Sequence, residues 1–403
     1  WNEAIAAYLI CLMFIGKGLQ NAAGGYAEEA GSDSIWQFWV SLNFNLDYFF
    51  DATIMMIVLV YPVPILRNFR QLKIGFGIIV SMISIRLVLV MIGMPHTGWE
   101  LFGLLYVVCG VIWGSIYLKF RLISDDKRNS STENIAFVSA LFLTLLLGHI
   151  WMSTPDMLLQ SEYFYFIDLW GTTGLTSSFY DYSWQLGYVF GISVGLTILF
   201  VEISQAIKGK ASIMLYFVLI YFICGMIRYL MHAFNTMGEM SLAWNDSFTM
   251  LEVWNLLTAN LHFTVIRPLI AMFILLKFRL FSVEEENRPM ARLMTVMLIV
   301  VATSAVLELI QTIIPINQMI SAALMGVIIA FGVGWEEKSF EKLVTDSADI
   351  REGVDKKWFP TYDLPKKYLD RLITVSVMFL LLSLIIAFIY WQSNIYVELL
   401  GSA

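Results

Sequence analysis

Charged side chains are scarce in this chain. Asp, Glu, Lys and Arg make up 14% of its 403 residues, and hydrophobic residues make up 59%. Soluble domains carry about 25% charged residues, so this balance excludes an ordinary soluble domain. Mean hydropathy is +0.73, and apolar runs recur from end to end at the length of about 20 residues that crosses a hydrocarbon core. We therefore predict a polytopic membrane protein in contact with the lipid bilayer.

Other absences narrow the class further. The three cysteines, Cys11, Cys109 and Cys224, all lie in apolar runs, so no disulfide is expected in an outer loop. The sequence contains no Walker loop, dinucleotide fingerprint, GxSxG elbow or HExxH motif. Strand-like alternation is absent, which predicts helical spans in an all-α fold. An enzyme is not favoured, although a site assembled from distant spans stays open, and no nucleic-acid partner is expected.

We predict eleven transmembrane helices. They lie near residues 4–22, 46–66, 74–94, 101–120, 135–154, 186–206, 212–234, 256–278, 292–314, 317–334 and 372–393. The odd-numbered connections, 23–45, 95–100, 155–185, 235–255 and 315–316, contain no Lys or Arg, whereas 21 of the 25 basic residues fall in or beside the even-numbered connections. The positive-inside rule then places the N-terminus in the cytoplasm and the C-terminus outside.

The pentapeptide LKFRL occurs twice, at Leu118–Leu122 and at Leu276–Leu280. Both copies lie where a predicted span reaches the cytoplasm. A cation next to an aromatic ring suits that interface, because the basic stem reaches the headgroups while the ring packs at the boundary. We interpret the motif as a recurrent exit signal, with a binding motif as the alternative.

Similarity between spans one to five and seven to eleven indicates an internal duplication. Residues Trp39–Tyr48 parallel Trp254–Phe263, with a shared Trp, Leu, Asn-Leu pair and closing aromatic. Both halves would enter from the cytoplasm, so the repeat would be parallel. The predicted division is 1–155 for the first half, 156–211 for an outer loop and span six, and 212–403 for the second half. Chance similarity among leucine-rich helices is the alternative.

Ionisable groups inside the spans are costly there and therefore mark functional sites. The predicted topology places ten of eleven such groups in the outer half, and Glu202 lies near the cytoplasmic side. A polar cavity open to the outside follows, with separate snorkelling residues and structural ion pairs as the alternative. We predict seven of these residues to bind solute: Lys17, Asp51, Arg86, His149, Arg228, Arg267 and Glu308.

All four histidines map to the predicted outer side: His96, His149, His232 and His262. Their spacing matches no zinc or haem signature, so we assign no metal site and leave the cofactor open. Sensing of external pH and ordinary hydrogen bonding remain alternatives for these imidazoles.

Two connections are long. Residues 155–185 are rich in aromatic side chains, which indicates an interfacial helix, with a lid that turns at Gly171 and Gly174 as the alternative. Residues 335–371 form the only sizeable cytoplasmic segment. This segment is too short for a catalytic domain, and it is the predicted surface for a protein partner.

The favoured function is a membrane transporter or channel for a small solute. Cationic groups outnumber deep acids in the predicted outer cavity, which favours an anionic solute. A membrane-embedded sensor or receptor module and a noncatalytic subunit of a membrane complex are the alternatives.

Overall fold

The structure is a computed structural model that describes residues 2–30, 35–91, 102–159, 178–234, 241–242, 245–280 and 366–393, with isolated positions between 288 and 354. These residues are mainly helical. Seven helices are long and apolar enough to cross a membrane: Glu3–Ala27, Trp36–Val60, Ser130–Pro155, Leu186–Ile207, Ile213–Met231, Met250–Lys277 and Asp370–Ile389. This architecture is compatible with a multi-pass membrane protein.

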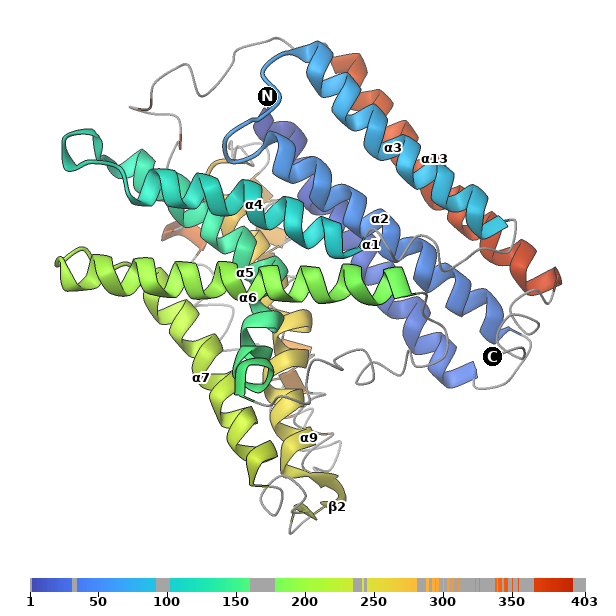
Figure 1. Cartoon of the computed structure of the whole chain (residues 1–403). Coiled ribbons are helices and arrows are strands. Elements are labelled where there is room, and N and C mark those ends of the chain that lie inside the picture. Colours follow the sequence, from blue (N-terminus) through green and yellow to red (C-terminus); the bar gives the residue numbers. More distant parts are fainter. Residues whose placement is uncertain are drawn as a thin grey trace. The chain divides into compact units, whose positions relative to one another are not determined.

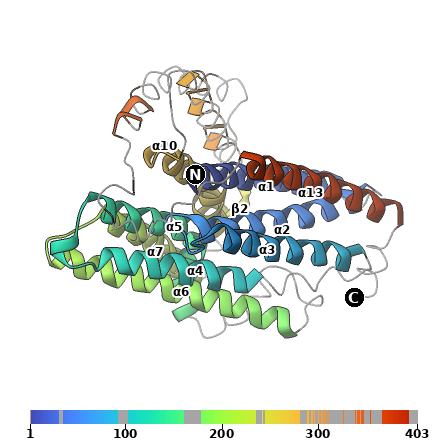
Figure 2. The same cartoon turned by 90° about the horizontal axis from the view of Figure 1, so that it is seen from above.

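The chain divides into two compact units, and each is described by itself (Figures 1 and 2). Unit 1 comprises Trp1–Ile112, Tyr165–Tyr188 and Gly353–Ala403. Unit 2 comprises Trp113–Phe164 and Val189–Glu352. The predicted division into 1–155, 156–211 and 212–403 rests on an internal duplication. The division into packed units does not test it.

An antiparallel helical hairpin of α1 (Asn2–Ala30) and α2 (Trp36–Val60) forms the centre of unit 1. Gly24 permits the close approach, because a Cβ there would lie 2.7 Å from the Asn43 side chain. The helix α2 begins at Trp36, not near residue 46 as predicted. The prediction failed because Gln37, Ser41 and Asn45 read as a polar loop, whereas the helix buries all three along one face.

The last described helix, α13 (Lys366–Ser393), packs against α2 in the opposite direction. Phe379 stacks on Phe49 with ring centroids 5.2 Å apart. Further along, Trp391 meets Phe38 at 6.4 Å. Because α1 is also antiparallel to α2, the helices α1 and α13 run in the same direction.

The helix α3 (Phe69–Met91) lies beside α13, as Figure 1 shows. The ring centroids of Phe69 and Tyr368, near the starts of these helices, are 4.5 Å apart. Lys73 and Arg371 lie over the Tyr368 ring, at 4.9 Å and 5.4 Å from its centroid. Basic residues from two predicted cytoplasmic connections therefore gather at one end of unit 1. Which side of the membrane this end faces stays a prediction.

The helix α5 (Ser130–Leu159) is the centre of unit 2 and packs parallel to α7 (Ile213–Ala233) (Figure 2). Two glycines permit their contact. A Cβ at Gly148 would lie 2.9 Å from the Tyr221 ring, and a Cβ at Gly225 would lie 2.2 Å from the Met152 carbonyl oxygen. Gly148 meets Tyr221, and Met152, one turn later on α5, meets Gly225, one turn later on α7. The two helices therefore run in the same direction.

Two further helices supply side chains to unit 2. These are α4 (Phe102–Arg121), followed by the short helix η2 (Asp125–Lys127), and α6 (Ser178–Ile207). Trp113 of α4 stacks on Phe142 of α5 at 4.6 Å. On the other helix, the carbonyl of Gly191 accepts a hydrogen bond of 3.1 Å from Trp151 Nε1. Both contacts fix large buried aromatic side chains of the unit.

The strands β1 (Ser241–Leu242) and β2 (Asn245–Thr249) form an antiparallel hairpin that the sequence analysis missed, because so short a pair carries no visible alternation. A capping box of Thr249 and Glu252 then starts α9 (Met250–Asn255). The chain continues through two π-helical segments, η5 (Leu256–Asn260) and η6 (His262–Ile266), into α10 (Arg267–Lys277).

The predicted count of eleven spans is not confirmed. Seven predicted spans correspond to the helices of membrane length, and spans three and four correspond to α3 and α4. Spans nine and ten lie mainly outside the described residues, as do the connections 155–185 and 335–371. The parallel direction of α1 and α13 requires an odd number of crossings between them.

The internal repeat is not confirmed either. Trp39 stacks on Tyr26 of α1 with centroids 4.8 Å apart. Trp254 instead donates from Nε1 to the carbonyl of Cys224 on α7, at 3.0 Å. The two tryptophans that the repeat pairs therefore make different contacts with their neighbouring helices. The duplication stays a prediction.

Candidate functional site

Four polar side chains from three helices of unit 2 meet in a group that we call the histidine cluster: His149, Tyr221, His262 and Arg267. His149 comes from α5 and Tyr221 from α7. His262 and Arg267 come from the span that contains η6 and α10. His262 is 0% exposed and Arg267 is 7% exposed, so a permanently charged guanidinium lies inside a helix of membrane length.

The hydrogen bonds of the cluster define a proton arrangement. Arg267 Nε donates to Nε2 of His262 at 3.3 Å. Because arginine only donates, this nitrogen must keep its lone pair, and the neutral imidazole carries its proton on Nδ1. That nitrogen lies 2.7 Å from the Tyr221 hydroxyl oxygen, to which it then donates. Arg267 therefore sets the tautomer of His262, and the Tyr221 hydroxyl oxygen accepts the hydrogen bond from the Nδ1–H of that tautomer.

Two further hydrogen-bond contacts of Arg267 are long. Nη2 lies 3.4 Å from the Leu146 carbonyl and 3.4 Å from Nδ1 of His149. The guanidinium also lies 4.4 Å from the centroid of the Phe263 ring. Good N–H···O bonds are about 2.9–3.0 Å, so these two contacts are weak. The Phe263 ring and the Leu146 carbonyl also stabilise the charge of the guanidinium.

The helix that carries His262 and Arg267 is irregular at this level. Its two π-helical segments occupy Leu256–Asn260 and His262–Ile266. Pro268 follows directly and has no N–H to donate to a carbonyl one turn earlier, which explains why a regular α-helical ladder cannot run through this point. π-Helical turns occur frequently at functional sites.

A second arginine extends the polar groups along α5 and α7. Arg228 Nη1 lies 3.5 Å from the Ser153 hydroxyl oxygen. Ser153 in turn donates to the His149 carbonyl one turn earlier, at 3.2 Å. Arg228 lies two turns after Tyr221 on α7. The polar groups thus continue from the histidine cluster along the contact between these two helices.

The structure brings together three of the seven predicted site residues, His149, Arg228 and Arg267, around this one contact. The other described ones lie in unit 1. Lys17 Nζ lies 3.3 Å from the Asp47 carboxylate and also donates to Gln20. Asp51 lies one turn after Asp47 on α2 and is half-buried. The Arg86 side chain, on α3, and all of Glu308 lie outside the described part of the chain.

The seven predicted residues omit three that shape the cluster. The first is His262, because the predicted topology places it close to an interface, where an ionisable group costs less. Tyr221 is neutral, and a search for charges in spans cannot find it. Gly148 is the third: a Cβ there would lie 2.8 Å from His262 and 2.9 Å from Tyr221. The proline after Arg267 was a usable signal, since a proline within a span marks an irregular helix.

A second buried group in unit 2, which we call the loop-end cluster, consists of Tyr117, Arg121, Glu202 and Lys210. Arg121 binds Glu202 through two hydrogen bonds of 2.8 Å and 2.7 Å. It also donates to the Lys210 carbonyl at 2.8 Å, and the Tyr117 hydroxyl donates to Glu202 at 2.7 Å. Glu202 is 0% exposed and Arg121 6%. Of the two basic residues of this LKFRL copy, Arg121 therefore binds a buried carboxylate, whereas Lys119 is exposed.

Among the residues that the structure describes, no three His, Cys, Asp or Glu side chains gather closely enough to hold a metal ion. The nearest approach of imidazoles is His149 to His262, with ring centroids 6.4 Å apart. The histidine cluster is better suited to hydrogen bonding and to the binding of a charged group than to metal ligation.

The fold and these sites define a helical protein with several helices of membrane length and with polar groups buried inside them. Comparison with protein-family models, with curated proteins and with solved structures finds no match to this chain. Function is therefore inferred from the residues of the sites themselves.

Proposed function

We propose that this chain is an integral membrane transporter or channel for a small anionic solute, and that Arg267 is the residue that binds the anion. The observation that carries the proposal is the buried guanidinium of Arg267, held by contacts of 3.3 Å and 3.4 Å at an irregular point of a membrane-length helix. Ionisable residues at depth mark solute pathways by default.

The chemistry of arginine supports an anion as the solute. A guanidinium stays charged at any accessible pH and presents a planar fork of donors that matches a carboxylate or phosphate. The long contacts to His149 and to the Leu146 carbonyl cost little to exchange for the short, charge-assisted bonds of about 2.7–2.9 Å that an anion forms. Arg228, further along the contact of α5 and α7, provides a second cation on the same route.

The form of the helix supports the same reading. Transporters commonly bind solute where a spanning helix is broken, because the freed backbone groups there line a cavity. Here the break covers η5 and η6, directly before Arg267 and Pro268. The predicted topology places these residues in the outer half of the bundle, which agrees with the outer polar cavity expected from the sequence.

Uptake by reconstituted protein tests the proposal. Proteoliposomes loaded with unlabelled acetate, lactate, phosphate or sulfate receive the same labelled anion outside, and counterflow is measured. We expect counterflow of at least one anion by the parent. Arg267→Gln is expected to abolish it, and Arg267→Lys to reduce it, because Lys keeps the charge and loses the fork. The matched control is Arg279→Gln, since Arg279 is exposed at the end of α10.

Binding measurements separate the alternatives. An anion that raises the melting temperature of the parent and not of Arg267→Gln, without counterflow, would favour a sensor or receptor over a transporter. If no anion of the panel is bound or moved, the proposed function is rejected. Melting of Arg267→Lys in the absence of anions shows whether the variant is folded.

A further inference from the structure

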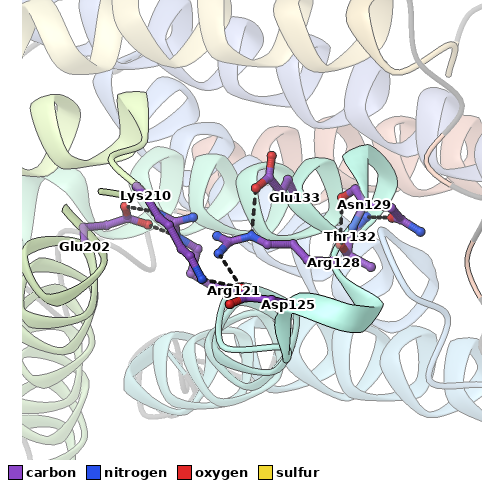
Figure 3. Close-up of polar contacts among 8 residues, drawn as sticks. All are labelled: Arg121, Asp125, Arg128, Asn129, Thr132, Glu133, Glu202 and Lys210. Atoms are coloured by element: carbon purple, nitrogen blue, oxygen red, sulfur yellow. Dashed lines mark hydrogen bonds and ion pairs between the residues drawn. The ribbon is translucent and has the colours of Figure 1, made fainter. Parts of the chain in front are cut away.

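A polar cavity of about 490 Å³ lies next to the loop-end cluster, at the opposite ends of α5 and α7 from Arg228. Its walls come from the end of α4, the start of α5, the end of α6 and the start of α7. The polar lining residues are Tyr117, Arg121, Arg128, Glu133, Asn134, Glu202, Lys210 and Ser212. Figure 3 shows how the charged members of this group face one another. The histidine cluster does not contribute to this lining.

The carboxylates of the lining are already held by cations. Glu202 receives both hydrogen bonds from Arg121, as described above. Glu133 accepts from Nε of Arg128 at 2.8 Å, which Figure 3 also shows. Three cations, Arg121, Arg128 and Lys210, line the cavity against these two carboxylates. The third cation, Lys210, pairs with Asp125, an exposed carboxylate that does not line the cavity.

The Arg128 guanidinium has one nitrogen that donates no hydrogen bond within the described residues. Its side chain is 12% exposed, and its Nη1 lies 3.9 Å from Asp125. Its Nη2 is buried, and among the described residues it has no hydrogen-bond partner. A buried donor without a partner is unfavourable, and more so when it is charged. A ligand acceptor that reaches this nitrogen from the cavity would satisfy it.

The start of α7 adds a partial positive charge. Ser212 caps this helix by accepting from the Met214 N–H at 3.1 Å, and Ser212, Ile213 and Met214 all line the cavity. The N-terminus of a helix of 21 residues thus faces the cavity. Helix N-termini favour anions, because their first N–H groups lack partners in the helix.

We propose that this cavity binds a phosphate group, supplied by an anionic phospholipid headgroup or by a free phosphate. A phosphate offers several acceptor oxygens to a cavity that has excess donors, and arginine binds it through two nitrogens. The predicted topology places this end of unit 2 on the basic, cytoplasmic side, at headgroup level. Pockets of basic residues between membrane helices on that side bind anionic headgroups. The proposal does not depend on solute movement at Arg267.

The test uses the full chain with two phosphate sources. In detergent, the melting temperature is measured with inorganic phosphate and with chloride at equal ionic strength. In a second arm, protein in vesicles of phosphatidylcholine, with or without phosphatidylglycerol, is extracted and its retained phospholipid is quantified. Variants are Arg128→Gln, Arg128→Lys and Lys210→Gln. The matched control is Lys127→Gln, because Lys127 is an adjacent exposed cation that does not line the cavity.

We expect Arg128→Gln to weaken phosphate or phosphatidylglycerol binding by about tenfold to a hundredfold, the loss that a charge-assisted hydrogen bond implies. Arg128→Lys and Lys210→Gln should lose less, and Lys127→Gln should bind as the parent does. A shift with inorganic phosphate identifies free phosphate as a sufficient ligand, and selective retention of phosphatidylglycerol alone identifies the lipid. Absence of both effects, or an equal loss in Arg128→Gln and Lys127→Gln, overturns the proposal.

Discussion

Among the described residues of unit 2, Arg121 and Arg267 are both buried, in two different ways. Arg121 meets a carboxylate through two bonds of 2.8 Å and 2.7 Å, whereas the hydrogen-bond contacts of Arg267 are to imidazoles and a carbonyl at 3.3 Å and 3.4 Å. In the first arrangement a carboxylate neutralises the guanidinium, so Arg121 gains little by exchanging this partner for another. The second holds the guanidinium by longer contacts, which suits the anion-binding role that we propose for Arg267.

The comparison predicts its largest effect at the Arg121–Glu202 pair. Arg121→Met should lower the free energy of unfolding by about 3–5 kcal/mol, because it leaves a buried carboxylate without its cation. The double variant Arg121→Met with Glu202→Leu should recover much of this loss, since apolar replacements of buried pairs are often tolerated. Thermal unfolding in detergent measures both.

The control for this prediction is the second LKFRL copy. Arg279→Met, at an exposed residue, should change stability little. If the double variant is as unstable as the sum of the two single changes, Arg121 and Glu202 are not coupled as the structure indicates.

The two LKFRL copies also show what a local motif does not determine. The aromatic ring is buried in both copies, with Phe120 3% and Phe278 2% exposed. The arginines differ: Arg121 is buried and Arg279 is exposed. The difference comes from Glu202, 81 positions away in the chain, and local sequence cannot report such a partner.

Two tyrosines provide a finer comparison. Tyr117 donates to the Glu202 carboxylate and Tyr221 pairs with the neutral His262, each at 2.7 Å. Hydrogen bonds to charged groups contribute about 1.5–3 kcal/mol, against about 0.5–1.5 kcal/mol for neutral ones. Tyr117→Phe should therefore destabilise more than Tyr221→Phe, as unfolding curves of the two variants would measure. Equal losses would contradict the distinction between the two clusters.

The close helix packing at the histidine cluster predicts a loss of stability similar to or smaller than that of the tyrosine variants. Gly148→Ala should destabilise by about 1–3 kcal/mol, because the new Cβ would lie 2.8 Å from His262 and 2.9 Å from Tyr221. The matched control is Gly114→Ala on α4, where nothing lies within 4 Å of an added Cβ. Melting temperatures of both variants are the measurement. A tolerated Gly148→Ala would mean that the histidine cluster is not closely packed.

Much of the fold follows from the sequence and less of the site does. Apolar runs of about 20 residues predict where helices lie, because the bilayer fixes their length. The start of α2 escaped this reasoning because Gln37, Ser41 and Asn45 are polar and buried. The presence of a charge inside a span predicts Arg267 and Arg228 as candidate site residues. Which groups they meet depends on helix directions and on small residues such as Gly148, which carry no charge signal.

The smallest effect is expected at Asp125, on the rim of the loop-end cluster. The Lys210 ammonium donates to this carboxylate and holds the pKa of Asp125 below its usual range. A lowered folded pKa means that the carboxylate contributes stability above its unfolded pKa of about 4, and that this contribution is lost as the pH falls through the folded value. Asp125→Asn should therefore melt slightly below the parent at pH 7 and together with it in strong acid. The Asp125 side chain is 72% exposed, so salt should shrink the difference at pH 7. The buried pair of Arg121 and Glu202 should show no such salt effect in the melting of Arg121→Met. A difference at Asp125 that persists in high salt would contradict this contrast between an exposed and a buried ion pair.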